Sequence, residues 1–496
     1  MLSAVVFLPV AVAVVLLAVP RTSDRLVRWL WIAATAIDLA LVVGLWIGYS
    51  PGPGGFAYEV NVKWIPSISS GYHLGVDGLS LPLVALTAVL FLACAVYSFR
   101  DSDRLRSYAA LFLFLQTVCL GLFVALDLIL FFVFFDLSIV GMYFVIAGWG
   151  HRNAAKAALK FFLYTFLGSL ALLLGFIGLY LAATPHTFDI VELARQAPLT
   201  GTGFAGAAVL IALGIGFAIK TPTVPFHTWL PPAHTEAPAA GSAILAGVLL
   251  KMGTYGFVRI MMPVLPDTWR RYAIVFVFVG VVSVIYGALV SLAQRDFKRM
   301  IAYTSVNHMG YILLAVGAAG IVASSTAQAR EIAVTGAVTQ MVSHGLITGA
   351  LFLLSGVLYQ RGQTYEMDSY GGLAGTAPRF AGLTALAAFA SLGLPGFSGF
   401  IAEFQIFTGS LGSAPVSTVV AFLGILVTAA LFLRAFQKIF LGPYRAPTDR
   451  VGDITVVEGV AIVPLIAAAV VIGIFPRFLL EVIEPASRIV VTLVGR

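Results

Sequence analysis

Four ionisable residues lie deep inside apolar stretches of this sequence, and their types suit proton transfer: Asp136, Lys220, Lys251 and Glu403. A charge at the middle of a bilayer costs at least about 3 kcal/mol, and some estimates exceed roughly 10 kcal/mol. We therefore expect a chain that keeps two lysines and two carboxylates there to use them. Lys220 and Glu403 also lie next to Pro- and Gly-rich segments. Acids and bases placed in this way indicate a path for protons or other ions across a membrane.

The composition excludes a water-soluble protein for nearly the whole chain. Of the 496 residues 60% are hydrophobic and only 10% are charged, and the mean hydropathy is +1.00, whereas a soluble domain carries roughly 25% charge. We predict an all-α polytopic membrane protein. About fourteen stretches approach the roughly 20 apolar residues that a membrane span needs: 2–20, 27–48, 76–98, 107–126, 128–149, 157–183, 203–223, 237–262, 272–293, 299–319, 332–360, 380–410, 416–441 and 456–480.

The N-terminal stretch and the two cysteines are not candidates for a chemical role. The stretch 1–19 has no basic segment before it and is followed at once by another apolar stretch, so a first span is favoured over a signal peptide. Cys94 and Cys119 fit no metal-ligand spacing and are expected to be small buried hydrophobic side chains. The net charge of +7 fits a membrane protein, and nucleic acid is not expected as a partner.

The basic residues orient the predicted bundle. Lysines and arginines are about twice as frequent at the loops that follow odd-numbered spans as at the others, so the positive-inside rule places those loops in the cytoplasm. Both termini are then expected outside. The two longest polar gaps, 49–75 and 184–202, have the length of loops that hold short surface helices or hairpins.

Two predicted spans are interrupted. The span 203–223 reaches Lys220-Thr-Pro-Thr-Val-Pro225, and the span 380–410 contains Gly393-Leu-Pro-Gly-Phe-Ser-Gly399. Proline removes a backbone donor and clashes with the preceding helical turn, and broken helices in two halves of a bundle indicate an ion site between inverted repeats. No repeat is evident residue by residue. We divide the chain into 1–106 (spans 1–3), 107–262 (first five-helix repeat, spans 4–8), 272–441 (second five-helix repeat, spans 9–13) and 456–496 (span 14 and tail).

Each of the four ionisable residues has two interpretations. Asp136 lies about nine residues into its span, where a carboxylate is either protonated or paired with a cation. Lys220 either exchanges protons or caps carbonyls at the Pro222 break, and both roles are compatible. Lys251 lies too deep to reach the interface easily, and Glu403 is the acidic counterpart of Lys220. The alternative to proton transfer is a structural role, in which these residues form ion pairs that hold the helices together.

Histidines extend the list of candidates. His308 and His344 lie inside spans, where imidazole can relay protons or can simply form packing hydrogen bonds. His227 and His234 flank a Pro-rich loop and are candidates for proton uptake or for shaping the loop; a metal site lacks further ligands. No convincing phosphate cradle, dinucleotide unit, cysteine cluster or paired-histidine haem site is present. We therefore expect the chain itself to bind no cofactor and to carry no electrons.

Three motifs give the chain a family resemblance. They are FAIKTPTVPFHTWLPPAH at 217–234, DFKRMIAYTSVNHMG at 296–310 and AFASLGLPGFSGFIAEF at 388–404. Over about residues 70–440 the chain resembles the antiporter-like subunits L, M and N of respiratory complex I, a family that includes cation/proton antiporter subunits. A glutamate at 403 is similar to the M type, whereas the L and N types have lysine. The absence of a long C-terminal lateral helix also argues against the L type.

The resemblance implies a fold and roles. It implies fourteen helices with inverted repeats and a central hydrophilic axis, in which Asp136 pairs with Lys220, Lys251 bridges and Glu403 is the terminal acid. His308 and His344 match polar axis positions. The family usually has glutamate where this chain has Asp136, so the pair with Lys220 is expected to be longer, water-bridged or weaker.

The resemblance also implies that the chain is one subunit of a larger complex. We expect a proton-translocating membrane-arm subunit of NADH–quinone oxidoreductase in a bacterial cytoplasmic membrane. Its expected partners are lipid and the L- and N-type subunits, with NADH, FMN, iron–sulfur clusters and quinone bound in other subunits. A sodium/proton antiporter subunit and a purely structural membrane scaffold are the alternatives.

Overall fold

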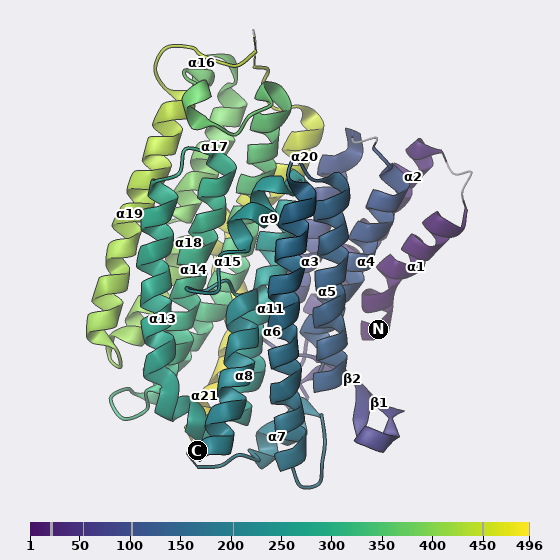
Figure 1. Cartoon of the computed structure of the whole chain (residues 1–496), viewed down its shortest axis with the longest axis vertical. Helices are drawn as coiled ribbons and strands as arrows, with labels where there is room; N and C mark the ends of the chain where they lie inside the picture. The colour runs from purple at the N-terminus through teal and green to yellow at the C-terminus, as the bar shows by residue number, and fades with distance from the viewer. Residues whose placement is uncertain (20–22, 53, 101–102, 202, 449–450, 496) are drawn as a thin grey trace.

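The computed structural model describes residues 1–19, 23–52, 54–100, 103–201, 203–448 and 451–495. These residues form a bundle of long helices that run up and down between two ends (Figure 1). Ten helices in these ranges are long and apolar enough to cross a membrane, and α1 (Leu2–Ala18) and α8 (Phe204–Lys220) are shorter apolar helices. The prediction of an all-α multi-pass membrane protein is confirmed. The count of fourteen spans, the inverted repeats and the domain boundaries stay predictions.

The first part of the chain contains five further long helices. Polar capping marks two of their starts: the side chain of Ser23 accepts a hydrogen bond at the beginning of α2, and that of Asp127 accepts two at the beginning of α5. The five helices are α2 (Asp24–Ile47), α3 (Leu81–Tyr97), α4 (Leu105–Val124), α5 (Leu128–Trp149) and α6 (Ala154–Ala182), with the short turn η2 (Ser98–Arg100) after α3.

Two loops contain short elements. The gap 49–75 holds an antiparallel hairpin of β1 (Ala57–Ile65) and β2 (Ser70–Val76), joined by the short turn η1 (Pro66–Ile68), with Val60 opposite Leu74. The expectation of a surface helix or hairpin there is confirmed. The gap 184–202 holds α7 (Ile190–Gln196), whose first turn is capped by the Asp189 carboxylate.

The first predicted break is present, and the eighth span is less regular than expected. The helix α8 ends at Lys220, and the chain resumes as α9 (Leu230–Glu236). The following span alternates between α-helix and wider π-helical turns, which often occur at functional sites in helices. Its segments are α10 (Ala239–Ile244), the π turn η3 (Leu245–Leu249), α11 (Leu250–Gly256), the π turn η4 (Phe257–Met261) and α12 (Met262–Val264).

The second half also contains a broken span. One predicted stretch, 380–410, is split into α17 (Pro378–Ser391) and α18 (Ser398–Leu411), as its Pro-Gly segment predicts. The helix α15 is packed along its length by α18, α14, α20 and α21. The remaining elements are α13 (Pro266–Leu292), α14 (Phe297–Gly320), α15 (Ala327–Gly362), η5 (Met367–Ser369), α16 (Leu373–Thr376), α19 (Pro415–Phe440), α20 (Val456–Ile474) and α21 (Arg477–Val494).

The predicted last span, 456–480, is wrong at its end. The helix α20 stops at Ile474, and a separate helix α21 begins at Arg477 after Pro476. The helix α21 is amphipathic and packs one face on α15, α12 and α13. Its apolar residues follow those of α20 closely in sequence, so hydropathy alone merged the two helices.

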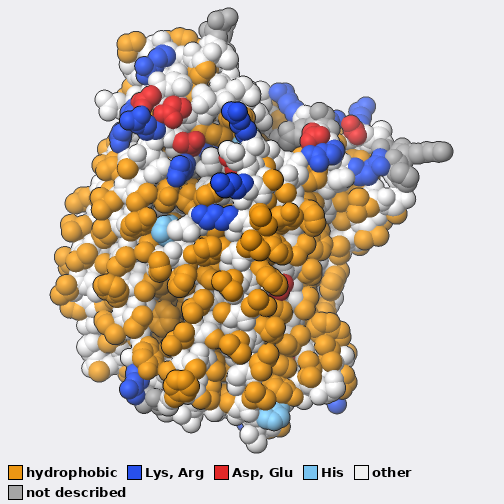
Figure 2. Space-filling view, viewed as in Figure 1, with side chains coloured by type: hydrophobic (Ala, Val, Ile, Leu, Met, Phe, Trp, Pro, Cys, Tyr) orange, Lys and Arg blue, Asp and Glu red, His pale blue; other side chains and the backbone are white. Residues whose placement is uncertain are grey.

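Charge is concentrated at the two ends of the bundle. Figure 2 shows a broad hydrophobic belt between a lower end with few charges and an upper end with many, mostly basic ones. The belt has the character of a lipid-facing surface, and the basic upper end is the one predicted to face the cytoplasm. Three residues that enter that orientation argument, Arg21, Arg450 and Arg496, lie outside the described residues.

At the opposite end of the bundle, a histidine of the β1–β2 hairpin contacts the start of α7. His73 on β2 is buried; its Nδ1 lies 2.5 Å from the Asp189 carboxylate and its Nε2 lies 2.8 Å from that of Glu59. Burial alone lowers the pKa of His73, but the hydrogen bonds and charges of Asp189 and Glu59 outweigh it, so the pKa is raised above its ordinary value of 6.5. The contacts hold β1, β2 and the start of α7 together.

The raised pKa of His73 predicts pH-dependent stability. Because the folded state holds the proton more tightly, the contribution is complete below pH 6.5 and is lost as the pH rises through the folded-state pKa. We expect the thermal unfolding midpoints of wild type and His73→Asn to differ at acidic pH and to converge at alkaline pH. Thr187→Ala, which removes an uncharged hydroxyl that accepts a hydrogen bond from the Asp189 amide, is the control and should show no such convergence. A constant gap between wild type and His73→Asn would contradict the prediction.

Candidate proton-transfer site

Lys251 is joined directly to a histidine of another helix. Its side chain is completely buried on α11, between the two π turns. The amine Nζ donates a hydrogen bond to the Ala246 carbonyl at 2.5 Å and lies 2.6 Å from Nδ1 of His344 on α15. The Lys251 amine supplies the hydrogen of this contact when Nδ1 of His344 is unprotonated, and His344 supplies it when Nδ1 carries the hydrogen. The pair can therefore hold one proton at either of two positions.

His344 leads towards a second histidine and an acid. The ring of His344 lies 5.4 Å from the ring of His308 on α14, measured between centroids. Nδ1 of His308 is 3.7 Å from the Glu403 carboxylate and accepts a hydrogen bond from the Gln340 amide at 3.1 Å. Nε2 of His308 lies 3.2 Å from the Ser391 hydroxyl. Four titratable side chains from α11, α15, α14 and α18 thus follow one another without an intervening layer of apolar residues.

A small polar cavity lies among these groups. It has a volume of about 10 Å³ and is lined by both histidines, Gln340 and Glu403, together with residues of the second helix break. That volume is close to the minimum for a single water, which needs polar partners of this kind. One water there would complete the connection between His344, His308 and Glu403.

The second break creates the space for Glu403. Gly393, in the chain between α17 and α18, has φ +68°, and a Cβ there would clash with Oε2 of Glu403. A side chain at this position would collide with the carboxylate and would strain the backbone. Ser398, the first residue of α18, contacts the hydroxyl of Ser343 on α15 at 2.7 Å. The Pro-Gly segment therefore positions the acid beside His308.

Lys220 ends its helix and contacts a hydroxyl of α5. Its side chain is buried; Nζ donates to the Ser138 hydroxyl at 2.8 Å and lies 4.7 Å from the centre of the Phe135 ring. The backbone groups freed by the break are satisfied nearby, since the Trp229 indole donates to the Ile219 carbonyl and the Ser283 hydroxyl accepts from the Val224 amide. These bonds allow a helix to end inside the bundle.

The predicted contact between Asp136 and Lys220 is not direct. In the described part of the chain no nitrogen–oxygen contact of 4.0 Å or less joins them. Asp136 is half-buried, lies beside the Ser169 hydroxyl and remains within electrostatic range of Lys220. The shorter aspartate side chain accounts for the separation, and Ser138 supplies the oxygen that contacts the amine instead.

The pair of Asp136 and Lys220 is separated from Lys251 and the residues that follow it. Thr221, next to Lys220, is buried with its hydroxyl unpartnered, and it packs directly against Gly253, two residues after Lys251. Among the described residues no hydrogen bond or ion pair joins Lys220 to Lys251, and Thr221 is a polar side chain at the contact between their two helices. The structure brings together Lys251, His344, His308 and Glu403, and leaves Asp136 and Lys220 as a neighbouring pair.

Known proteins share this arrangement of helices and motifs. A family model described as "NADH:quinone oxidoreductase/Mrp antiporter, TM" matches residues 125–429. The chain belongs to this family. The NADH-quinone oxidoreductase subunit M of Rickettsia prowazekii (strain Madrid E) is 38% identical over 467 residues, covering 93% of this chain and 92% of the relative. The F(420)H(2) dehydrogenase subunit M of Methanosarcina mazei is 36% identical over 462 residues, covering 92% of this chain and 91% of the relative.

Solved structures agree with the family assignment. A chain of respiratory complex I from Thermus thermophilus superposes with a TM-score of 0.90 at 29% identity, covering 100% of both chains. A chain of the Mrp complex from Dietzia sp. DQ12-45-1b superposes with a TM-score of 0.85 at 23% identity, covering 100% of this chain and 99% of the other, which shows a shared fold. The resemblance to the antiporter-like subunits is confirmed, and both relatives described above are M subunits.

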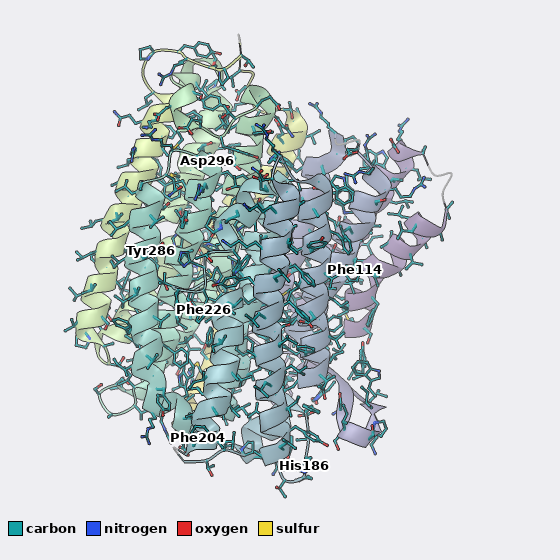
Figure 3. The ribbon with its side chains drawn as sticks, in the orientation of Figure 1. Phe114, His186, Phe204, Phe226, Tyr286 and Asp296 are labelled. Atoms are coloured by element: carbon teal, nitrogen blue, oxygen red, sulfur yellow. The ribbon has the colours of Figure 1, made fainter. Side chains whose placement is uncertain are left out.

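The two loop histidines of this family member occupy different surroundings. His227 follows Phe226, which lies at about mid-height of the bundle in Figure 3, and its ring packs against Tyr286 at 4.9 Å between centroids. His234 is completely buried, stacks on Phe352 at 4.4 Å, and both its ring nitrogens lack partners. In the described ranges no group of three or more His, Cys, Asp or Glu side chains could hold a metal ion. A role in proton uptake stays a prediction for both.

Sequence reasoning missed several polar partners of the site. Ser138, Gln340 and Ser391 are uncharged, so a search for buried charges passes over them, although each contacts a candidate residue. Arg259 on η4 was not among the candidates either, although it is buried and pairs with Asp77, which precedes α3.

Proposed function

We propose that this chain translocates protons as the M-type membrane-arm subunit of a bacterial NADH–quinone oxidoreductase. The observation that carries the proposal is the buried series Lys251, His344, His308 and Glu403, whose members are in contact or one water apart. Its membership of a family with M-subunit relatives supports the assignment to a redox-driven complex. Acids and bases buried inside membrane helices typically belong to proton relays.

In the proposed mechanism the charge on Asp136 favours the ammonium form of Lys220. When this interaction weakens, a proton moves towards Lys251, with the Thr221 hydroxyl and transient water between the two lysines. Lys251 passes it to His344 across the 2.6 Å contact, His344 passes it to His308, and His308 passes it to Glu403. Glu403 then releases the proton on the far side. Redox chemistry in other subunits drives the cycle.

The proposal defines the surroundings of the chain. Other membrane subunits, of the L and N types, flank it, and lipid covers the hydrophobic belt of Figure 2. NADH, FMN, iron–sulfur clusters and quinone are bound by partner subunits, and this chain binds no cofactor. The basic upper end of the bundle faces the cytoplasm of a bacterium, and both termini face outward.

The composition of the purified native complex tests the assignment. Co-purification with flavin- and iron–sulfur-containing subunits is expected, together with NADH-dependent acidification of the lumen of inverted vesicles. A sodium/proton antiporter subunit is the second candidate, favoured by the shared fold with the Mrp complex. Isolation with antiporter subunits alone, and transport that needs sodium but no electron donor, would favour that candidate and reject ours.

A structural scaffold predicts a different result. If the buried charges only hold helices together, the combined change Asp136→Asn, Lys220→Met, Lys251→Met and Glu403→Gln leaves transport intact. Replacement of buried charged groups by apolar ones of similar volume is often neutral or stabilising. We therefore expect the combined variant to assemble and to lose proton transport.

A further inference from the structure

A third acid buried in an apolar helix, Asp38, lies outside the proposed path. Asp38 is near the middle of the 24-residue helix α2 and is completely buried, and it satisfies the same criterion as the four residues predicted from sequence, although it was not predicted. Its neighbours are α1, α3 and α4, far along the chain from the second break. In Figure 3 Phe114, two residues before its partner Gln116, lies at mid-height of α4.

Among the described residues, only one of the two carboxyl oxygens of Asp38 has a hydrogen-bond partner. Nε2 of Gln116 donates to Oδ2 of Asp38 at 2.6 Å. The other carboxyl oxygen, Oδ1, and the amide oxygen of Gln116 are both buried, and neither has a hydrogen-bond partner among the described residues. In the described part of the chain Asp38 has no lysine, arginine or histidine within 4.0 Å. Two acceptor oxygens thus lie in one apolar core without a donor.

One proton satisfies both acceptors. An ionised carboxylate can only accept hydrogen bonds, whereas a carboxylic acid has one O–H donor. An unpaired carboxylate at this depth would cost several kcal/mol at least, and each buried polar atom without a partner adds to that cost. We propose that Asp38 is permanently protonated and forms a two-bond acid–amide pair with Gln116, in which the acid O–H donates to the amide oxygen and the amide N–H donates to the acid.

The pair has a structural role separate from proton transfer. It joins α2 to α4, beside the contact in which the Thr117 hydroxyl of α4 accepts a hydrogen bond from the Val10 amide of α1. Among the described residues the polar side chain in contact with Asp38 is an amide and no titratable group contacts the carboxyl, so its proton has no direct acceptor there. The three helices therefore carry an acid that fixes their packing and does not exchange its proton during turnover.

Asparagine at position 38 tests this inference. An amide–amide pair can form the same two bonds, so Asp38→Asn should keep the thermal unfolding midpoint and the proton pumping of the assembled complex. Asp38→Leu and Gln116→Leu should each lower the midpoint, and the double variant should lose less than the sum of the two. The infrared carbonyl stretch of a protonated acid should persist well above neutral pH in wild type and decrease in Asp38→Asn.

Three outcomes would overturn the inference. Loss of pumping in assembled Asp38→Asn would show that the acid ionises during turnover. A midpoint for Asp38→Asn as low as that of Asp38→Leu would show that the two-bond pair does not form. An infrared spectrum unchanged by Asp38→Asn would show that the residue is ionised. The last two readouts do not depend on transport, so they are independent of the proposed function.

Discussion

Lys251→Met is expected to abolish proton transport while leaving the protein folded. Lys251 is the only member of the buried series in contact with both the Ala246 backbone carbonyl and His344 in the described structure. Methionine has a similar length and no proton to exchange. Because a positioned acid or base typically contributes about 10²-fold or more to a proton-transfer step, we expect proton transport by the complex to fall by roughly 100-fold.

The control for Lys251→Met separates transport from stability. Methionine removes the cost of burying a charge but leaves the Ala246 carbonyl and the His344 nitrogen without their contact to the amine, so we expect a folded variant with at most a small change in the unfolding midpoint. Lys438→Met removes a lysine that pairs with Asp368 at the upper end of the bundle, and it should leave pumping unchanged. Proton transport in vesicles is the measurement. Wild-type transport by Lys251→Met would remove Lys251 from the path.

Asp77→Asn is expected to give the largest loss of stability. The carboxylate pairs with Arg259, both side chains are about 8% exposed, and Oδ1 also accepts hydrogen bonds from the Leu79 and Ser80 amides at 3.0 and 3.1 Å. Asparagine keeps the capping oxygen but leaves the guanidinium buried without a counter-charge. Breaking a buried ion pair in this way costs about 3–5 kcal/mol.

A double-mutant cycle identifies the cause of that loss. Arg259→Met should destabilise for the same reason, because it leaves Asp77 uncompensated. The double variant Asp77→Asn with Arg259→Met should be less destabilised than the sum of the single changes, since neither charge remains. Unfolding midpoints of the three variants measure this. Additive effects would contradict a direct pair between Asp77 and Arg259.

Most of the helices and both helix breaks could be predicted from local features of the sequence. Hydropathy located the helices, and Pro222 and the Gly393–Gly399 segment located the breaks, because both signals act locally on the backbone. The π turns around Lys251 could not be predicted, since no residue type marks them. The separate helix α21 was missed because a turn at Pro476 is shorter than the resolution of a hydropathy window.

The site was predicted residue by residue but not as a set of contacts. His308, His344 and Glu403 come from three helices, and only packing determines which of them meet. The pair of Asp136 and Lys220 was expected to be longer, water-bridged or weaker because aspartate is one methylene shorter than glutamate, but the contact of Lys220 with Ser138 was not predicted. Asp38 carried the same signal as the other buried acids and was overlooked.

The most direct test of the account is the number of protons pumped per electron in vesicles that contain the complex with Lys220→Ala. Lys220 lies at the first helix break, between Asp136 and the connected series, so its removal should interrupt transfer without touching any redox centre. The account predicts an assembled complex whose electron transfer is accompanied by fewer protons than in wild type. An unchanged number of protons per electron would contradict it.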